Sequence, residues 1–146
     1  MSKADTAVNF HEVCKYNCAQ SVAAAYAKDF GLETDRALQM AMGFGGGIGR
    51  LQETCGAVSG ACMILGLASG FKEGDGRDKI NAVYAEVRRL VEDFTREKGT
   101  VKCRDLLGCN LLSEEGQKYF NDHNLRENCL GYIRLACELL DKYLVK

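Results

Sequence analysis

The 146-residue sequence contains no proline and no tryptophan, and its charges form no block of either sign. The lack of proline, together with 47% hydrophobic residues, argues against a proline-rich linker, a disordered tail or a collagen-like repeat. The 19 Lys and Arg residues nearly balance the 20 Asp and Glu residues, which gives a net charge of −1. The chain therefore lacks the electrostatic basis for binding nucleic acid or an anionic membrane surface, and we expect neither as a partner.

Targeting signals are also missing. Residues 1–10 contain neither the apolar segment nor the small-residue cleavage site of a signal peptide. We therefore expect a cytoplasmic, reducing location, where thiols stay free unless a metal or a catalytic cycle uses them. The uncharged stretch at residues 54–71 approaches the length of a membrane span, but it contains four glycines and two serines. It is better explained as a buried helix.

Helical periodicity dominates the rest of the chain. Between Ile80 and Phe94, apolar residues recur at i, i+3, i+4 and i+7, whereas no segment alternates long enough to predict a strand. Five glycines within residues 43–49 interrupt the helical pattern. We predict one all-α domain over residues 1–146, a bundle of five or six helices with a Gly-rich loop. Helices are expected over residues 5–30, 34–43, 78–96 and 125–144, with Gly31 ending the first and Thr34 capping the second. Two further helices are expected to begin at Cys55, after the N-cap Thr54, and after the N-cap Ser113. Residues 103–107 are expected to form a short helical turn.

The chain has eight cysteines, more than packing requires, and at 16.0 kDa it can bury a core without disulfides. None forms a CxxC pair, so the compact zinc, rubredoxin-like, thioredoxin-like and c-type haem motifs are absent. Any metal site must therefore be assembled by tertiary structure from cysteines on separate elements. The cysteines fall in four pairs: Cys14 and Cys18, Cys55 and Cys62, Cys103 and Cys109, and Cys129 and Cys137.

Two cysteines have surroundings that favour the reactive thiolate. Cys55 follows the predicted N-cap Thr54, and Cys103 lies between two basic residues. Cys62 and Cys137 lie inside apolar helical segments and are typical of packing residues.

Several segments resemble one known family. They are Asn17-Cys18-Ala19-Gln20, Phe44-Gly45-Gly46-Gly47-Ile48-Gly49, Cys55-Gly56-Ala57-Val58-Ser59-Gly60-Ala61, Cys103-Arg104-Asp105-Leu106-Leu107-Gly108 and the late Cys129. The chain is similar to the C_GCAxxG_C_C family of redox-active proteins, whose pattern maps onto Cys18, Cys55, Cys103 and Cys129. A similar module accompanies haem-binding segments in split-Soret-type cytochromes, and this resemblance implies electron transfer and an iron–sulfur site. The haem motif itself is missing here, so no haem is expected.

Three functions are compatible with these four cysteines. The favoured one is electron transfer or redox sensing through a [2Fe–2S] or [4Fe–4S] cluster, with a redox partner protein. The second is a thiol–disulfide oxidoreductase in which Cys55 attacks and Cys103 resolves. The third is a zinc-stabilised helical interaction module. The remaining cysteines, Cys14, Cys62, Cys109 and Cys137, are expected to be inert thiols, with a second or larger cluster as the alternative.

The Gly-rich loop lacks the spacing of a phosphate-binding motif. We expect its backbone at Gly45, Gly46 and Gly47 to pass close to the cofactor and donate hydrogen bonds to sulfur. Gly56 and Gly60 allow close helix packing, either within the bundle or across the two-fold axis of a homodimer. His11 is expected to be solvent-exposed rather than a ligand or proton carrier, and His123 to lie in a polar turn.

Overall fold

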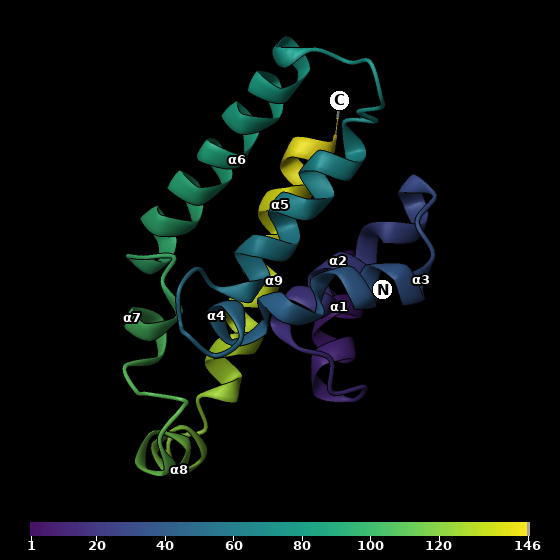
Figure 1. Ribbon diagram of the computed structural model, residues 1–146. Coiled ribbons are helices and arrows are strands. Elements are labelled where there is room, and N and C mark those ends of the chain that lie inside the picture. Colours follow the sequence, from purple (N-terminus) through teal and green to yellow (C-terminus); the bar gives the residue numbers. More distant parts are fainter. Residues whose placement is uncertain (146) are drawn as a thin grey trace.

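The computed structural model describes residues 1–145 and is all-helical, with no strand in that range. It contains eight right-handed α-helices rather than the five or six predicted (Figure 1). The short element α4 (Gly45–Ile48) is a left-handed turn, because Gly46 and Gly47 have φ of 64° and 67°. The bundle fold is thus confirmed and the number of helices is corrected.

The miscount arises mainly at the N-terminus, where the single helix expected over residues 5–30 is two helices. These are α1 (Lys3–Glu12) and α2 (Cys18–Ala27), and Lys15 between them has a φ of 65°. Asn17 stops the helix from continuing, because its side chain accepts a hydrogen bond from the Gln20 amide while the Gln20 side chain accepts one from the Asn17 amide. This capping box makes Cys18 the first residue of α2.

The core forms around α5 (Gly56–Ala68), which packs against α2, α6 (Arg77–Lys98) and α9 (Arg126–Leu144). In Figure 1, α5 and α9 lie side by side, with α1 and α2 crossing them. The largest fully buried side chains on these helices include Tyr26, Ile64, Phe94, Ile133 and Leu140. Residues 54–71 therefore contain a short core helix, as predicted, and no helix among residues 1–145 is long and apolar enough to cross a membrane.

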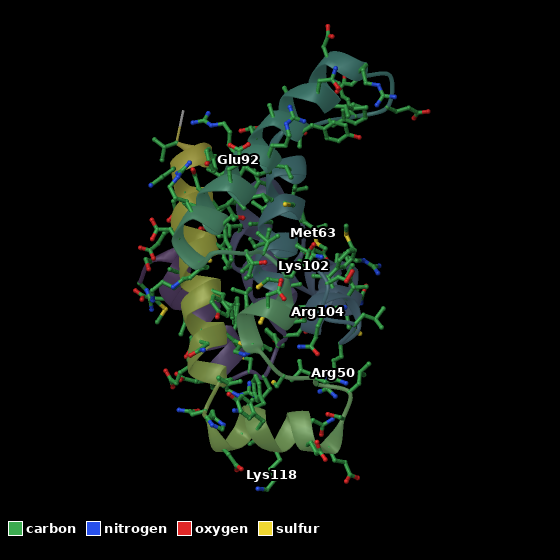
Figure 2. The ribbon with its side chains drawn as sticks, turned by 90° about the vertical axis from the view of Figure 1, so that its left-hand side faces the viewer. Arg50, Met63, Glu92, Lys102, Arg104 and Lys118 are labelled. Carbon is green, nitrogen blue, oxygen red and sulfur yellow. The ribbon has the colours of Figure 1, made fainter. Side chains whose placement is uncertain are left out.

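Shorter elements close the ends of the bundle. Figure 2 shows α8 (Glu114–Asp122) lying across one end of the molecule, with Lys118 on its outer side. As predicted, Cys103 begins α7 (Cys103–Leu107) and Ser113 caps α8. Two predicted caps are corrected: the N-cap of α5 is Cys55 rather than Thr54, and the N-cap of α3 (Thr34–Ala41) is Glu33 rather than Thr34. The shorter elements are η1 (Lys28–Phe30), α3 (Thr34–Ala41), η2 (Met42–Phe44), α4, α7 (Cys103–Leu107) and α8 (Glu114–Asp122).

The Gly56 and Gly60 pair packs inside the bundle. A Cβ atom at Gly60 would lie 2.7 Å from the Ala19 carbonyl oxygen, so α5 and α2 touch through their backbones at this point. Gly66, on the same helix, faces open space.

This difference predicts opposite effects of two Gly→Ala substitutions on the free energy of unfolding. Gly60→Ala should destabilise the protein by about 1–3 kcal/mol, because the methyl group forces α5 away from α2. Gly66→Ala should stabilise it by up to about 1 kcal/mol through helix propensity alone. Urea unfolding followed by circular dichroism measures both, and equal effects would contradict the described packing.

Candidate functional site

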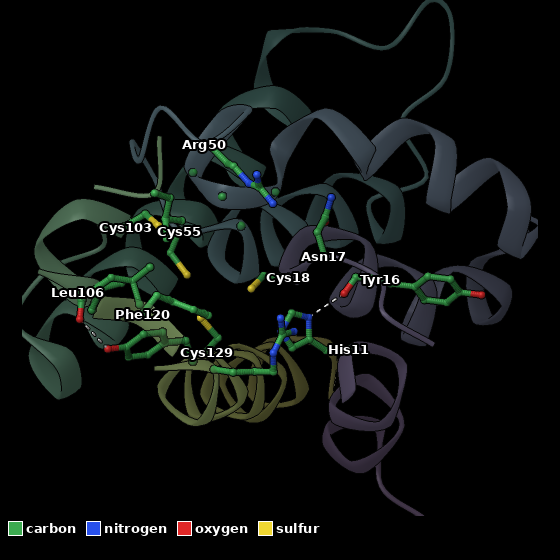
Figure 3. A pocket seen from close by; sticks show the side chains of 18 of the residues that line it. His11, Tyr16, Asn17, Cys18, Arg50, Cys55, Cys103, Leu106, Phe120 and Cys129 are labelled. Carbon is green, nitrogen blue, oxygen red and sulfur yellow. Dashed lines mark hydrogen bonds between the residues drawn. The ribbon is translucent and has the colours of Figure 1, made fainter. Parts of the chain in front are cut away.

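One cavity of about 480 Å³ collects four cysteines that are distant in the sequence. Cys18, Cys55, Cys103 and Cys129 all line it, and Figure 3 shows their side chains facing a shared space. The other four cysteines do not line this cavity. Cys14 is exposed, Cys62 and Cys109 are half-buried, and Cys137 lies in the core.

All four cavity cysteines lie at the start of a helix. Cys18 and Cys103 are the first residues of α2 and α7, Cys55 is the N-cap of α5, and Cys129 lies in the first turn of α9. The first turn of a helix has backbone N–H groups without intrahelical partners and carries the positive end of the helix dipole. The cavity is therefore surrounded by backbone that favours negative charge on sulfur.

A short antiparallel bridge between Thr54 and Lys102 holds Cys55 and Cys103 next to each other. The Cys55 amide donates to the Val101 carbonyl at 2.7 Å, and the Cys103 amide donates to the Glu53 carbonyl at 2.7 Å. The bridge fixes the starts of α5 and α7 relative to each other. The two cysteines are thus positioned by backbone hydrogen bonds.

Gln52 supports this bridge from the buried side, with only 4% of its surface exposed. Its side-chain nitrogen donates to the Cys109 carbonyl at 2.8 Å, and its oxygen accepts from the Leu111 amide at 2.9 Å. The side chain also hydrogen-bonds Cys103. Nothing in the sequence marks Gln52 as buried, so its role at this site could not be predicted.

The Gly-rich loop forms one wall of the cavity in an unusual backbone conformation. Residues 46–50 all have positive φ, between 56° and 68°. For the non-glycine residues Ile48 and Arg50 this conformation costs about 1–2 kcal/mol each. Such strain persists only where the surrounding structure imposes it, and it clusters at functional sites. Gly45, Gly46 and Gly47 line the cavity, and their contact with a cofactor stays a prediction.

Two glycines let the backbone approach the cysteines closely. A Cβ atom at Gly47 would lie 2.8 Å from the Cys103 Cβ atom, and one at Gly56 would lie 3.2 Å from the Cys18 Cβ atom. Either position would meet an immovable neighbour if it carried a side chain. The glycines therefore bring the loop onto α7, and α5 onto α2.

The predicted thiolates, Cys55 and Cys103, are corrected by the structure. Burial raises the pKa of Cys55 to about 12 and the pKa of Cys103 to about 11. The amides of Ala57 and Val58 lie beside the Cys55 sulfur and offset part of this rise, although no conventional cap hydrogen bond forms. Desolvation exceeds the favourable helix dipole at both sites, and it could not be judged from the sequence.

Cys129 is instead the cysteine whose pKa is lowered. The Cys18 thiol donates a hydrogen bond to the Cys129 sulfur, and the Arg126 guanidinium adds a favourable charge, while burial opposes both. The same hydrogen bond raises the pKa of Cys18, which keeps its proton. Of these two cavity thiols, Cys129 is therefore the one that ionises first.

His11 lines the same cavity and is buried, with 7% of its surface exposed, contrary to the prediction of a solvent-exposed side chain. Its Nδ1 lies 2.7 Å from the Tyr16 carbonyl oxygen and its Nε2 lies 3.3 Å from Arg126 Nη1. This pattern assigns the proton to Nδ1 and leaves Nε2 as an acceptor. Burial also lowers the pKa of His11, which favours the neutral ring. His123, by contrast, is exposed as expected and stacks on Tyr119.

Comparison with known proteins gives one match. Residues 16–143 match the family described as "Putative redox-active protein (C_GCAxxG_C_C)". This match covers nearly the whole chain and all four cavity cysteines, and it confirms the resemblance noted in the sequence. No curated protein and no solved structure matches the chain.

The lowered pKa of Cys129 predicts a distinct order of thiol alkylation in the metal-free protein. Cys129 should react with iodoacetamide at lower pH than Cys55 or Cys103, because a lowered pKa keeps the thiolate populated as the pH falls. Cys18→Ala removes the donor, and Arg126→Gln removes the charge. Each should move the pH dependence of Cys129 labelling upward, because each removes a group that lowers the pKa of Cys129.

Peptide mass spectrometry after timed alkylation measures these rates for each cysteine. Arg36→Gln is the matched control, because Arg36 is exposed on α3 and does not line the cavity. If Cys55 reacted first, or if the two cavity variants behaved like the control, the assignment of the thiolate would be wrong.

Proposed function

Because the chain belongs to the C_GCAxxG_C_C family of redox-active proteins, we propose that it binds an iron–sulfur cluster and transfers electrons or senses redox state. The proposed ligands are Cys18, Cys55, Cys103 and Cys129. The observation that carries the proposal is that these four thiols, each from a different helix, face one cavity. The proposed setting is the cytoplasm, where a reducing environment keeps such thiols available.

The cavity suits a cluster in size and in donor chemistry. Its volume of about 480 Å³ equals that of roughly 16 water molecules at about 30 Å³ each, which is ample for a core of a few iron and sulfide atoms. Iron–sulfur clusters are held by cysteine thiolates, commonly four. Four thiolates bring substantial negative charge, and the helix starts and the basic residues Lys15, Arg50 and Arg126 favour that charge.

A single zinc ion is the alternative metal for the four thiols. A tetrahedral zinc site with Zn–S bonds of 2.3 Å places its sulfurs about 3.8 Å apart. Among residues 1–145, no three His, Cys, Asp or Glu side chains are grouped so as to hold one ion. Analysis of bound iron, acid-labile sulfide and zinc therefore distinguishes a cluster from a zinc site.

An iron–sulfur cluster would supply a one-electron redox couple. The residues of the chain would set its potential: Arg50, Arg126 and the helix starts favour the more negative, reduced form, and burial opposes it. Leu106, Phe120 and Tyr132 line the cavity and would limit the access of water. Electrons would enter and leave through a redox partner protein that reaches the cavity opening.

The test is anaerobic purification followed by visible absorption and by analysis of iron, acid-labile sulfide and zinc. We expect a brown protein that contains iron and sulfide, and loss of most of the iron on substitution of Cys18, Cys55, Cys103 or Cys129 by serine. Cys62→Ser is the matched control for Cys55→Ser, because Cys62 lies on α5 but does not line the cavity. Colourless protein that contains zinc would support the zinc module instead, and equal effects of the two substitutions would refute the ligand assignment.

The Cys18 and Cys129 pair supports a second candidate function, thiol–disulfide exchange. Here the Cys129 thiolate would attack one sulfur of a substrate disulfide and release the other as a thiolate that takes up a proton. Cys18 would lose its proton and attack the mixed disulfide, which frees the second substrate thiol. The products are one reduced substrate and a Cys18–Cys129 disulfide, so two electrons pass from protein to substrate.

This pair differs from the Cys55 and Cys103 pair expected from the sequence, because it contains the cysteine with the lowered pKa. Treatment of the metal-free protein with a small disulfide should then link Cys18 to Cys129 and remove two hydrogen atoms from the protein mass. Peptide mapping identifies the bond. A metal-free protein that forms no bond between these residues would exclude this function.

A further inference from the structure

We propose that the part of the cavity bounded by Lys15, Arg50 and Arg126 binds a small oxyanion next to the cysteines. All three basic side chains line the cavity, and no Asp or Glu does. Within residues 1–145, none of the three forms an ion pair. Other arginines do pair with carboxylates, as Arg104 does with Glu53 and Arg134 with Asp5.

Arg126 is oriented without losing its charge. Its Nη1 donates to Nε2 of His11, whose Nδ1 donates in turn to the Tyr16 carbonyl. A carboxylate in the place of His11 would hold Arg126 equally well but would neutralise it. Because the supporting residue is a buried neutral imidazole, the Arg126 guanidinium keeps its positive charge, and its remaining N–H groups can donate hydrogen bonds to a ligand. The nearest carboxylate on α1, that of Glu12, is exposed and does not line the cavity.

Arg50 and the Gly-rich loop form the opposite side of this site. The Arg50 stem packs on Gly46, since a Cβ atom there would lie 2.8 Å from Arg50 Cγ. Figure 3 shows the Arg50 side chain reaching toward Asn17, across the cavity from His11. The amides of Gly49 and Arg50 already donate to the carbonyls of Gly43 and Gly45, so the loop contributes to this site by positioning the Arg50 side chain. Arg50 is exposed to solvent, and Figure 2 shows it between Arg104 and α8.

A small oxyanion matches these groups better than other ligands do. Planar guanidinium groups bind the oxygens of carboxylates, sulfate and phosphate through paired charge-assisted hydrogen bonds. The space left beside the cysteines is part of one cavity of about 480 Å³, which limits the ligand to a small molecule. The site would hold the anion within reach of the redox-active sulfurs. Binding alone is proposed, with no reaction of the anion.

The test is titration of the full-length, ¹⁵N-labelled protein with sodium sulfate, with sodium chloride at matched ionic strength as the reference, followed by NMR. It is carried out on the protein as isolated and again after removal of any metal. Sulfate should shift the amide signals of residues 45–50 and the Arg126 side-chain signals in a saturable manner. Arg126→Gln and Arg50→Gln should each weaken binding about tenfold, because each removes a charged hydrogen bond. Arg36→Gln, on the exposed face of α3, should leave affinity unchanged.

A matched pair at His11 tests the role of the neutral imidazole. His11→Gln should retain most of the affinity, because a neutral acceptor for Arg126 remains. His11→Glu should abolish binding although all the basic residues are still present. Circular dichroism verifies that both variants fold. If either His11 variant is unfolded, the Arg50→Gln variant still tests the site, because Arg50 is exposed.

Three results would overturn the proposal. The first is NMR shifts with sulfate that are no larger than those with chloride. The second is an equal affinity for sulfate of the Arg36→Gln, Arg50→Gln and Arg126→Gln variants. The third is sulfate binding that disappears whenever metal is bound. The last result would mean that the basic residues only balance the charge of a cluster. Metal content is measured separately, so a protein without iron that still binds sulfate at this site would refute the cluster and retain the anion site.

Discussion

The cysteine cavity depends on close packing against three glycines, where the backbone lies in contact with neighbouring residues. Gly47 lies against Cys103, Gly56 lies against Cys18, and Gly45 lies against the side chain of Asn17. A side chain at any of these positions would push one helix start away from the others. Because interiors are close-packed, such a displacement could not be absorbed locally, and the four sulfurs would no longer face one space. The same loop carries the left-handed backbone of residues 46–50.

The electrostatics of the site follow from two opposing effects. Burial disfavours charge on the cysteines, which is why the pKa of Cys55 and that of Cys103 rise. Helix starts, basic residues and the Cys18 thiol favour charge, and at Cys129 they exceed the cost of burial. The cavity thus favours negative charge, either that of thiolates that hold a metal cluster or that of a bound anion. This preference links the proposed cluster and the proposed anion site, because both use basic residues that have no carboxylate partner.

Some features were predictable because their signals are local. The periodic helix α6, the short helix that begins at Cys103 and the cap at Ser113 depend on neighbouring residues alone. The break before Cys18 has a local signal as well, since Asn17 and Gln20 have capping-box spacing, but helical periodicity on both sides obscured it. Burial left no such signal. His11 and Gln52 are polar residues that would ordinarily be exposed, and only contacts with distant segments bury them.

The sequence by itself determined the all-helical class, the absence of compact cysteine motifs and the family, because periodicity, spacing and motif are properties of residues near one another along the chain. The family resemblance singled out Cys18, Cys55, Cys103 and Cys129. Only the tertiary structure decided that they share one cavity, which of them ionises first and which basic residues among residues 1–145 have no carboxylate partner. These properties depend on desolvation and on distances between segments far apart in the sequence, such as those of Cys18 and Cys129, which are 111 residues apart. Packing of the helices sets those distances, and no local pattern records them.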